Sequence, residues 1–150
     1  MLKTIDPLLN PDILYAIASM GHGDVLAIVD CNFPIDSVAR KTVIGKPLRL
    51  DGVSAPRAGA AVLSLMPLDT FIPTPALRME VVGNPTQWTD VQVEFQDVIN
   101  RCEGPAFKLG GIERFAFYEA AKNAYAVLQT GESRLYGCFL LTKGIIPPAA

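Results

Sequence analysis

The segment Val25–Val29 reads VLAIV and is followed by Asp30. It is continuously apolar and lacks period-two alternation, which predicts a strand covered on both faces. In open α/β sheets, ligands gather outside the carboxyl ends of the strands. Asp30 therefore lies where the active site of an α/β fold is expected.

A helix is predicted directly before this strand. Asn10 can cap free backbone amides, Pro11 is preorganised for the first helical position, and Asp12 suits the positive end of the helix. Gly21 is a typical C-terminal stop. His22 then falls in a loop between two glycines. From its context alone, such a histidine is more often a surface residue than a catalyst.

Six further elements are predicted after the strand. Helices are expected at 54–67, 86–102 and 114–124, and strands at 77–82, 125–128 and 138–141, with 77–82 alternating like a half-exposed strand. A polar turn at 129–134 joins the last two strands. This alternation predicts the α/β class, with a mostly parallel or mixed sheet flanked by helices. We find no repeat or linker that divides the chain, so residues 1–150 are expected to form one domain.

Composition argues against several classes of protein. The net charge is -2 and the basic residues are scattered, which excludes a typical nucleic-acid interface. No apolar run reaches the roughly 18 residues that cross a bilayer, and the N-terminus does not resemble a signal peptide. Three cysteines without CxxC spacing and a single histidine make a zinc site difficult to assemble, and favour reduced thiols in the cytoplasm.

Five motifs occur in order along residues 2–144: Leu2–Ile5 with Pro7, Met20–Asp24, Asp30 before Asn32-Phe33-Pro34, Arg114–Glu119, and Thr130-Gly131-Glu132 leading to Tyr136-Gly137. Together they resemble the fucose mutarotase and ribose pyranase family. Each motif is short, and it is their joint order that is specific. The resemblance implies a three-layer α/β protomer and ring-shaped homo-oligomers whose sites lie near subunit contacts. A hydrophobic content of 50% at this length also favours subunit contacts.

The resemblance also implies roles for individual residues. His22 would be the proton donor, while Asp30 and Arg114 would contact the sugar. Tyr136 would line the same site together with the two residues after it, Gly137 and Cys138. Tyr118 belongs to the matching Arg114–Glu119 block. The expected substrate is a monosaccharide such as fucose or a related pyranose, and no metal or organic cofactor is expected.

The chemistry of anomer exchange suits these residue types. One proton must reach the ring oxygen and another must leave the anomeric hydroxyl, after which the ring opens, the C1–C2 bond rotates and the ring recloses. Imidazole can donate and retake a proton near neutral pH. Asp30 could accept hydrogen bonds from the sugar or orient His22, and the sequence leaves both open. Arg114 could bind hydroxyl oxygens, and Tyr118 or Tyr136 could relay a proton or anchor the sugar.

Alternatives to these roles remain at this stage. Arg114 and Tyr118, four residues apart on one helical face, could be a packing pair. Cys138 stands where the family usually has asparagine, and it could be a sugar contact or simply a small buried hydrophobe. The whole chain could also be a non-catalytic monosaccharide-binding or uptake-accessory protein that uses the same pocket.

Overall fold

The computed structural model describes residues 1–150 as five helices and six strands. The elements in chain order are α1 (Pro11–Ser19), β1 (Val25–Val29), α2 (Ile35–Ala39), β2 (Leu48–Leu50), α3 (Ala55–Leu63), β3 (Ala76–Met79), α4 (Asp90–Glu103), β4 (Gly110–Ile112), α5 (Arg114–Lys122), β5 (Ala126–Thr130) and β6 (Phe139–Thr142).

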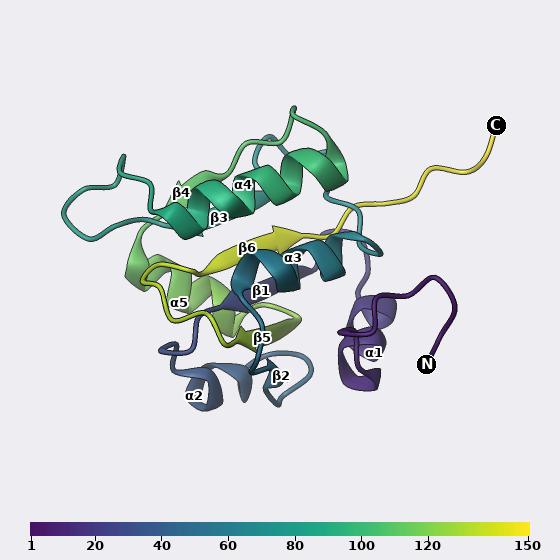
Figure 1. The fold of residues 1–150 in the computed structure, drawn as a ribbon, viewed down its shortest axis with the longest axis horizontal. Helices are drawn as coiled ribbons and strands as arrows, with labels where there is room; N and C mark the ends of the chain where they lie inside the picture. Colours follow the sequence, from purple (N-terminus) through teal and green to yellow (C-terminus); the bar gives the residue numbers. More distant parts are fainter.

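The six strands form one mixed sheet in the order β2-β5-β1-β6-β3-β4 (Figure 1). Strand β1 pairs in parallel with β5, which pairs in parallel with β2, and β3 pairs in parallel with β4. Strand β6 lies between β1 and β3 and is antiparallel to both. The mixed sheet predicted from the sequence is thereby confirmed.

Helices cover both faces of the sheet. On one face α1, α3 and α4 pack on a cluster that includes Leu26, Phe95 and Phe139, and the rings of Phe95 and Phe139 stack with centroids 3.8 Å apart. On the other face α2 and α5 pack on a smaller cluster that includes Val29 and Phe117. Strand β1 contributes to both clusters, because its alternate side chains point to opposite faces. The three-layer α/β arrangement is confirmed.

Local signals account for the helices that the sequence predicts. The Asn10 side chain accepts a hydrogen bond from the Ile13 amide at 3.0 Å and caps α1, and the Ser54 hydroxyl caps α3 through the Arg57 amide. The Glu113 carboxylate caps α5. Each cap satisfies amides that the first helical turn leaves free.

Three short elements were missed, and two predictions were wrong in detail. Helix α2 has five residues and strands β2 and β4 have three each, too few for a periodic pattern. The strand expected at 77–82 is β3, which ends at Met79 and is mostly buried, because the apolar clusters on the two faces of the sheet cover it, with Ala76 in one cluster and Met79 in the other. The polar segment 129–134 does connect β5 to β6, but its first two residues, Gln129 and Thr130, belong to β5, and β1 lies between the two strands in the sheet.

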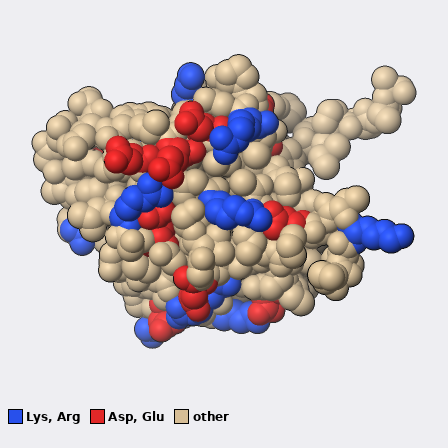
Figure 2. Space-filling view, viewed as in Figure 1, with Lys and Arg blue, Asp and Glu red and all other residues tan.

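The surface carries interspersed charges of both signs. On the face drawn in Figure 2, basic and acidic side chains are interspersed. Surface ion pairs include that of Arg134 with Glu94. None of the helices combines the length and the apolar character needed to span a membrane.

Candidate active site

A pocket of about 240 Å³ opens at the carboxyl end of β1. It is lined by Asp30, Asn32, Phe33, Met79, Arg114, Tyr118, Leu135, Tyr136 and Cys138. Five of the seven residues singled out in the sequence therefore meet here. The volume is smaller than the roughly 300 to 1,000 Å³ typical of drug-sized ligands and suits one small polar molecule.

Asp30 forms the acidic wall of the pocket. It is 6% exposed, and its Oδ1 accepts a hydrogen bond from the Asn32 amide at 3.0 Å. Burial raises the pKa of the Asp30 carboxyl, against the opposing effect of hydrogen bonds from Cys138 and from backbone amides. A carboxyl with a raised pKa exchanges protons more readily near neutral pH than an exposed one.

Cys138 lies beside Asp30 in the pocket. Its thiol donates a hydrogen bond to Asp30 Oδ2 at 3.4 Å, and the residue is 2% exposed. Burial, followed by the nearby Asp30 charge, raises the pKa of the Cys138 thiol well above its ordinary value. The thiol therefore stays protonated and acts as a donor. Cys138 is buried and also lines the pocket, so a contact between Cys138 and the sugar stays a prediction.

Arg114 and Tyr118 converge as their spacing on one helical face predicted. Arg114 Nε donates to the Tyr118 hydroxyl oxygen at 3.1 Å, on the first two turns of α5. The Tyr118 ring packs on Phe33 with centroids 5.4 Å apart. The two terminal nitrogens of the Arg114 guanidinium have no partner within the chain. They remain able to donate to a ligand in the pocket.

Tyr136 reaches the pocket through an uncommon backbone conformation. Its φ is 64°, in the left-handed region that bulky residues rarely adopt. The amide of Val82 donates to the Tyr136 hydroxyl oxygen at 3.2 Å. The phenolic hydrogen is thus left for another acceptor.

Gly137 supports the pocket from behind without lining it. A Cβ built at this position would come within 2.7 Å of the Glu132 side chain and 3.6 Å of Asp30 Cβ. Even an alanine at this position would therefore require the Glu132 side chain to move, whereas its distance to Asp30 would be an ordinary contact. Tyr136 and Cys138 line the cavity and Gly137 does not, so a contact of Gly137 with the sugar stays a prediction.

His22 lies at the opposite end of the sheet from this pocket. Strand β1 separates it from Asp30, and at about 3.3 Å per residue the strand alone spans about 13 Å. Within one chain, Asp30 therefore does not orient His22. Asp69 does so instead, because its buried Oδ1 lies 3.0 Å from His22 Nε2.

The contact with Asp69 determines which nitrogen of His22 carries hydrogen. The Phe71 amide, together with His22, lowers the pKa of the Asp69 carboxyl, which is therefore ionised and can only accept. His22 Nε2 is thus the donor, and Nδ1 is left to take up or release a proton. The imidazole side chain is 45% exposed and lies beside the Phe71 ring.

Sequence reasoning missed Asp69 and four of the pocket residues. Asp69 is 47 positions from His22, and nothing in its local pattern marks it as a partner. Asn32 and Phe33 were quoted only as part of a motif, whereas Met79 and Leu135 carried no signal. A search for carboxylates in loops at the amino end of the central strand would have included Asp69.

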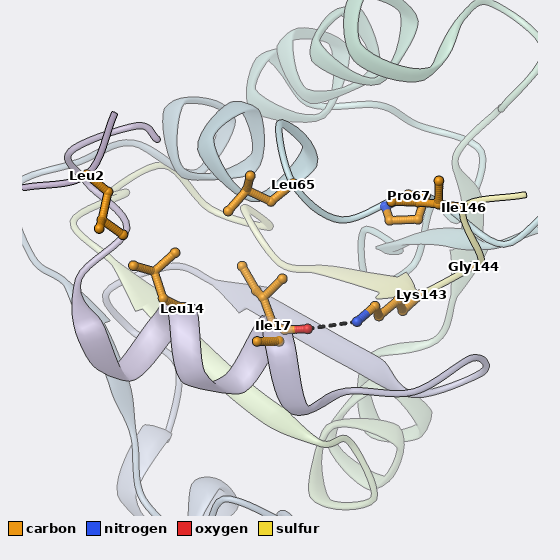
Figure 3. A pocket seen from close by; sticks show the side chains of 9 residues that line it. Leu2, Leu14, Ile17, Leu65, Pro67, Lys143, Gly144 and Ile146 are labelled. Atoms are coloured by element: carbon orange, nitrogen blue, oxygen red, sulfur yellow. Dashed lines mark hydrogen bonds between the residues drawn. The ribbon is translucent and has the colours of Figure 1, made fainter. Parts of the chain in front are cut away.

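Three further cavities are present, and the smallest, of about 200 Å³, shares Arg114 with the pocket and is also lined by Glu80 and Glu113. The largest two, of about 490 and 630 Å³, lie around α1 and the N-terminal residues. In the cavity of about 490 Å³, Lys143 is the one charged side chain, and its Nζ donates to the Ile17 carbonyl (Figure 3). The same Nζ also donates to the Met20 carbonyl. No group of three or more His, Cys, Asp or Glu side chains is arranged to hold a metal ion.

Comparison with known proteins agrees with the motif resemblance. The sequence model of the RbsD/FucU transport protein family matches residues 3–146. The chain belongs to this family. A fucose mutarotase from Bos taurus is 44% identical over 153 residues, covering 99% of this chain and 96% of the bovine protein.

Two solved structures share the fold. The crystal structure of protein Atu2016 is 60% identical, with a TM-score of 0.95 over 98% of this chain and 97% of the other. The fucose mutarotase of Streptococcus pneumoniae in complex with L-fucose is 33% identical, with a TM-score of 0.87 over 97% of this chain and all of the other.

Proposed function

We propose that this chain is a monosaccharide mutarotase that interconverts the anomers of a pyranose such as L-fucose. The observation that carries the proposal is the pocket at the carboxyl end of β1, where Asp30, Arg114, Tyr118 and Tyr136 surround a space suited to one sugar. The similarity of this chain to fucose mutarotases over nearly its whole length supports the same activity.

Asp30 can carry one proton transfer of the reaction, and the two tyrosines can relay a proton or anchor the sugar. The Asp30 carboxylate accepts a hydrogen bond from a sugar hydroxyl, and its raised pKa suits removal of the anomeric proton. Tyr118 and Tyr136 each accept one hydrogen bond from the protein, so each keeps its own hydroxyl hydrogen for the sugar.

Arg114 serves in this proposal as the anchor for the sugar. Its Nε is engaged by Tyr118, which fixes the plane of the guanidinium. The two terminal nitrogens can then donate to neighbouring hydroxyl oxygens in a defined geometry. A fixed sugar is required because the opened chain must rotate about C1–C2 and reclose without leaving the pocket.

We infer that His22 acts at the pocket of a second copy of this chain. It lies too far from its own Asp30, yet it is exposed and already oriented by Asp69. Apolar side chains lie exposed near both places: Phe71, 68% exposed, is beside His22, and Leu135, 67% exposed, lines the pocket. A head-to-tail contact that repeats around a ring would bring His22 of one copy to the pocket of the next copy.

Three properties of the whole molecule follow from this proposal. The chain works as one domain within a homo-oligomer, so sedimentation at micromolar concentration should give a mass well above 16.2 kDa. A monodisperse 16.2 kDa species that is active would contradict the shared site. The free cysteines, two of them exposed, fit a reducing compartment such as the cytoplasm.

Saturation-transfer NMR across a panel of monosaccharides tests the activity. It detects exchange between anomers at equilibrium and identifies the preferred sugar in the same experiment. Accelerated exchange for fucose or another pyranose is expected. Binding without accelerated exchange would instead support a non-catalytic sugar-binding or uptake-accessory protein, an alternative consistent with the family's description as transport proteins.

A further inference from the structure

The conformation of Tyr136 requires support from the surrounding structure. A bulky residue with a φ of 64° is disfavoured relative to an extended or helical backbone. Such a residue persists only when its neighbours hold it in place. Tyr136 lies in the loop between β5 and β6, whose other residues form no regular element that could hold it.

Gln92, in the first turn of α4, holds the backbone of this tyrosine. Its Nε2 donates to the Tyr136 carbonyl at 3.2 Å and to the Met79 carbonyl at 2.8 Å. Met79 ends β3 and itself lines the pocket. One amide group therefore links the end of a central strand to the loop that presents Tyr136.

The acceptor side of the Gln92 amide is also fully used. Its Oε1 accepts from the Thr89 amide at 3.3 Å and from Arg78 Nη1 at 3.4 Å. These two partners are donors, whereas Met79 and Tyr136 offer carbonyl oxygens, so only one orientation of the amide satisfies all four. Gln92 is completely buried, which makes loss of any of these bonds costly.

Arg78 extends the same network to the loop between β3 and α4. The guanidinium is buried without a carboxylate partner, donates to the Pro85 and Gln87 carbonyls, and lies 4.7 Å from the centre of the Trp88 ring. This loop carries Val82, whose amide contacts the Tyr136 hydroxyl. Gln92 thus holds the Tyr136 carbonyl directly. The loop that contacts the Tyr136 hydroxyl is linked to the Gln92 side chain through Arg78.

We propose that Gln92 is a positioning residue for the pocket: its side-chain amide holds Tyr136 in the left-handed conformation and so directs the phenol toward the sugar. The effect of Gln92 on catalysis rests on the proposed mutarotase function, but its effect on the orientation of Tyr136 does not. The alternative is that Gln92 merely caps α4 through Thr89.

Gln92→Glu separates these two roles. The carboxylate retains an acceptor for Thr89 and Arg78, so the cap survives, but it removes both donors and opposes two carbonyl oxygens. Gln92→Met, which keeps the volume and removes every polar atom, is the second variant. Both should slow anomer exchange by about tenfold to a hundredfold, the usual cost of a displaced group in an active site.

Gln96 supplies a matched control one helical turn further along α4. Its amide donates to the Phe107 carbonyl and to Asn100, and accepts from the Leu109 amide, but it has no contact with Tyr136. Gln96→Glu and Gln96→Met remove equivalent bonds from the same helix. They should leave the exchange rate close to that of the unmodified protein.

A fluorine label on tyrosine reports the position of residue 136 directly. The chain has four tyrosines, so 3-fluorotyrosine gives four ¹⁹F signals, of which Tyr136→Phe identifies one. In both Gln92 variants this signal should move while the other three stay, and in the Gln96 variants none should move. This readout holds even if the protein proves to bind sugars without turnover.

Three results would overturn the proposal. The first is an unchanged exchange rate in folded Gln92→Glu and Gln92→Met. The second is a loss of exchange in these variants while the Tyr136 signal does not move. The third is failure of both variants to fold, which would show that the Gln92 amide is required for folding. If the unmodified protein does not accelerate anomer exchange, the mutarotase proposal fails. The role of Gln92 in positioning Tyr136 is then tested by the ¹⁹F signal alone, and an unmoved Tyr136 signal in the Gln92 variants would contradict it.

Discussion

The thiol of Cys138 donates a hydrogen bond to Oδ2 of Asp30 across 3.4 Å, joining two residues that are 108 positions apart in the sequence. A thiol is a weak donor, whereas an amide is a strong one. The acidic wall of this pocket is therefore held more loosely than an amide would hold it.

Cys138→Asn should change sugar preference. The amide would donate more strongly to Asp30 and present a further polar group to the pocket. We expect the ratio of exchange rates between fucose and at least one other pyranose to change severalfold, equivalent to about 1 kcal/mol, one ordinary hydrogen bond. A melting curve is measured beside the two rates. A large loss of stability with an unchanged ratio would show that residue 138 does not influence the choice of sugar.

Asp30→Asn should abolish exchange while stabilising the fold at neutral pH. Burial raises the pKa of Asp30, so the folded chain binds this proton more tightly than the unfolded chain. Stability therefore falls as pH rises from the ordinary aspartate pKa through the raised one, and the full penalty is present above it. The asparagine removes that penalty.

The check on Asp30 is a pair of melting curves against pH. The advantage of Asp30→Asn should be largest at neutral pH and should vanish below the ordinary aspartate pKa, where the parent carboxyl is protonated in both states. An Asp30→Asn protein that is less stable than the parent at neutral pH would contradict the assigned cause of the shift.

Mixing two inactive variants should restore activity if the site is shared. His22→Gln and Asp30→Asn each remove one half of the site, and each alone should lower exchange by about a hundredfold to ten-thousandfold. Random co-assembly at equal amounts gives an intact His22 beside an intact Asp30 in about one quarter of the contacts of a ring.

The mixture needs co-refolding or co-expression, so that subunits exchange. Recovery of about one quarter of the parent rate is expected for head-to-tail contacts. No recovery from co-assembled His22→Gln and Asp30→Asn would mean that each site is built within one chain. A mixture of two His22→Gln preparations with different tags serves as the control.

Asp69→Asn should reduce turnover more than sugar binding. The parent carboxylate accepts from His22 Nε2 at 3.0 Å, whereas an asparagine can offer its NH₂ and favour the other tautomer. We expect the exchange rate at saturating sugar to fall by about a hundredfold or more, with little change in sugar affinity. Equal losses in Asp69→Asn of affinity and rate would instead indicate that the 69–72 loop has moved.

Exhaustive chelation should leave the activity intact. Ring opening and closure need only proton transfers, and the pocket residues Asp30, Tyr118 and Tyr136 can exchange protons directly. Exchange rates are compared before and after EDTA and dialysis. Activity that disappears and returns with one added metal would contradict the proposed mechanism.

Local patterns in the sequence were sufficient for much of the fold. Asn10 and Pro11 marked the start of α1, the apolar run Val25–Val29 marked β1, and Arg114 met Tyr118 as four-residue spacing requires. Even the separation of His22 from Asp30 was implicit, because a whole strand lies between them. Caps, periodicity and strand length act within a few residues, so they can be read without knowing what packs against them.

Other features came into view only with the tertiary structure. The strands β2 and β4 exist because β5 and β3 pair with them, and three residues alone do not specify a strand. The pairing of His22 with Asp69, the bond from Cys138 to Asp30 and the support of Tyr136 by Gln92 join residues 44 to 108 positions apart. Such contacts depend on how the sheet orders its strands and on which loops then meet at each edge, and no local pattern of residues carries that information.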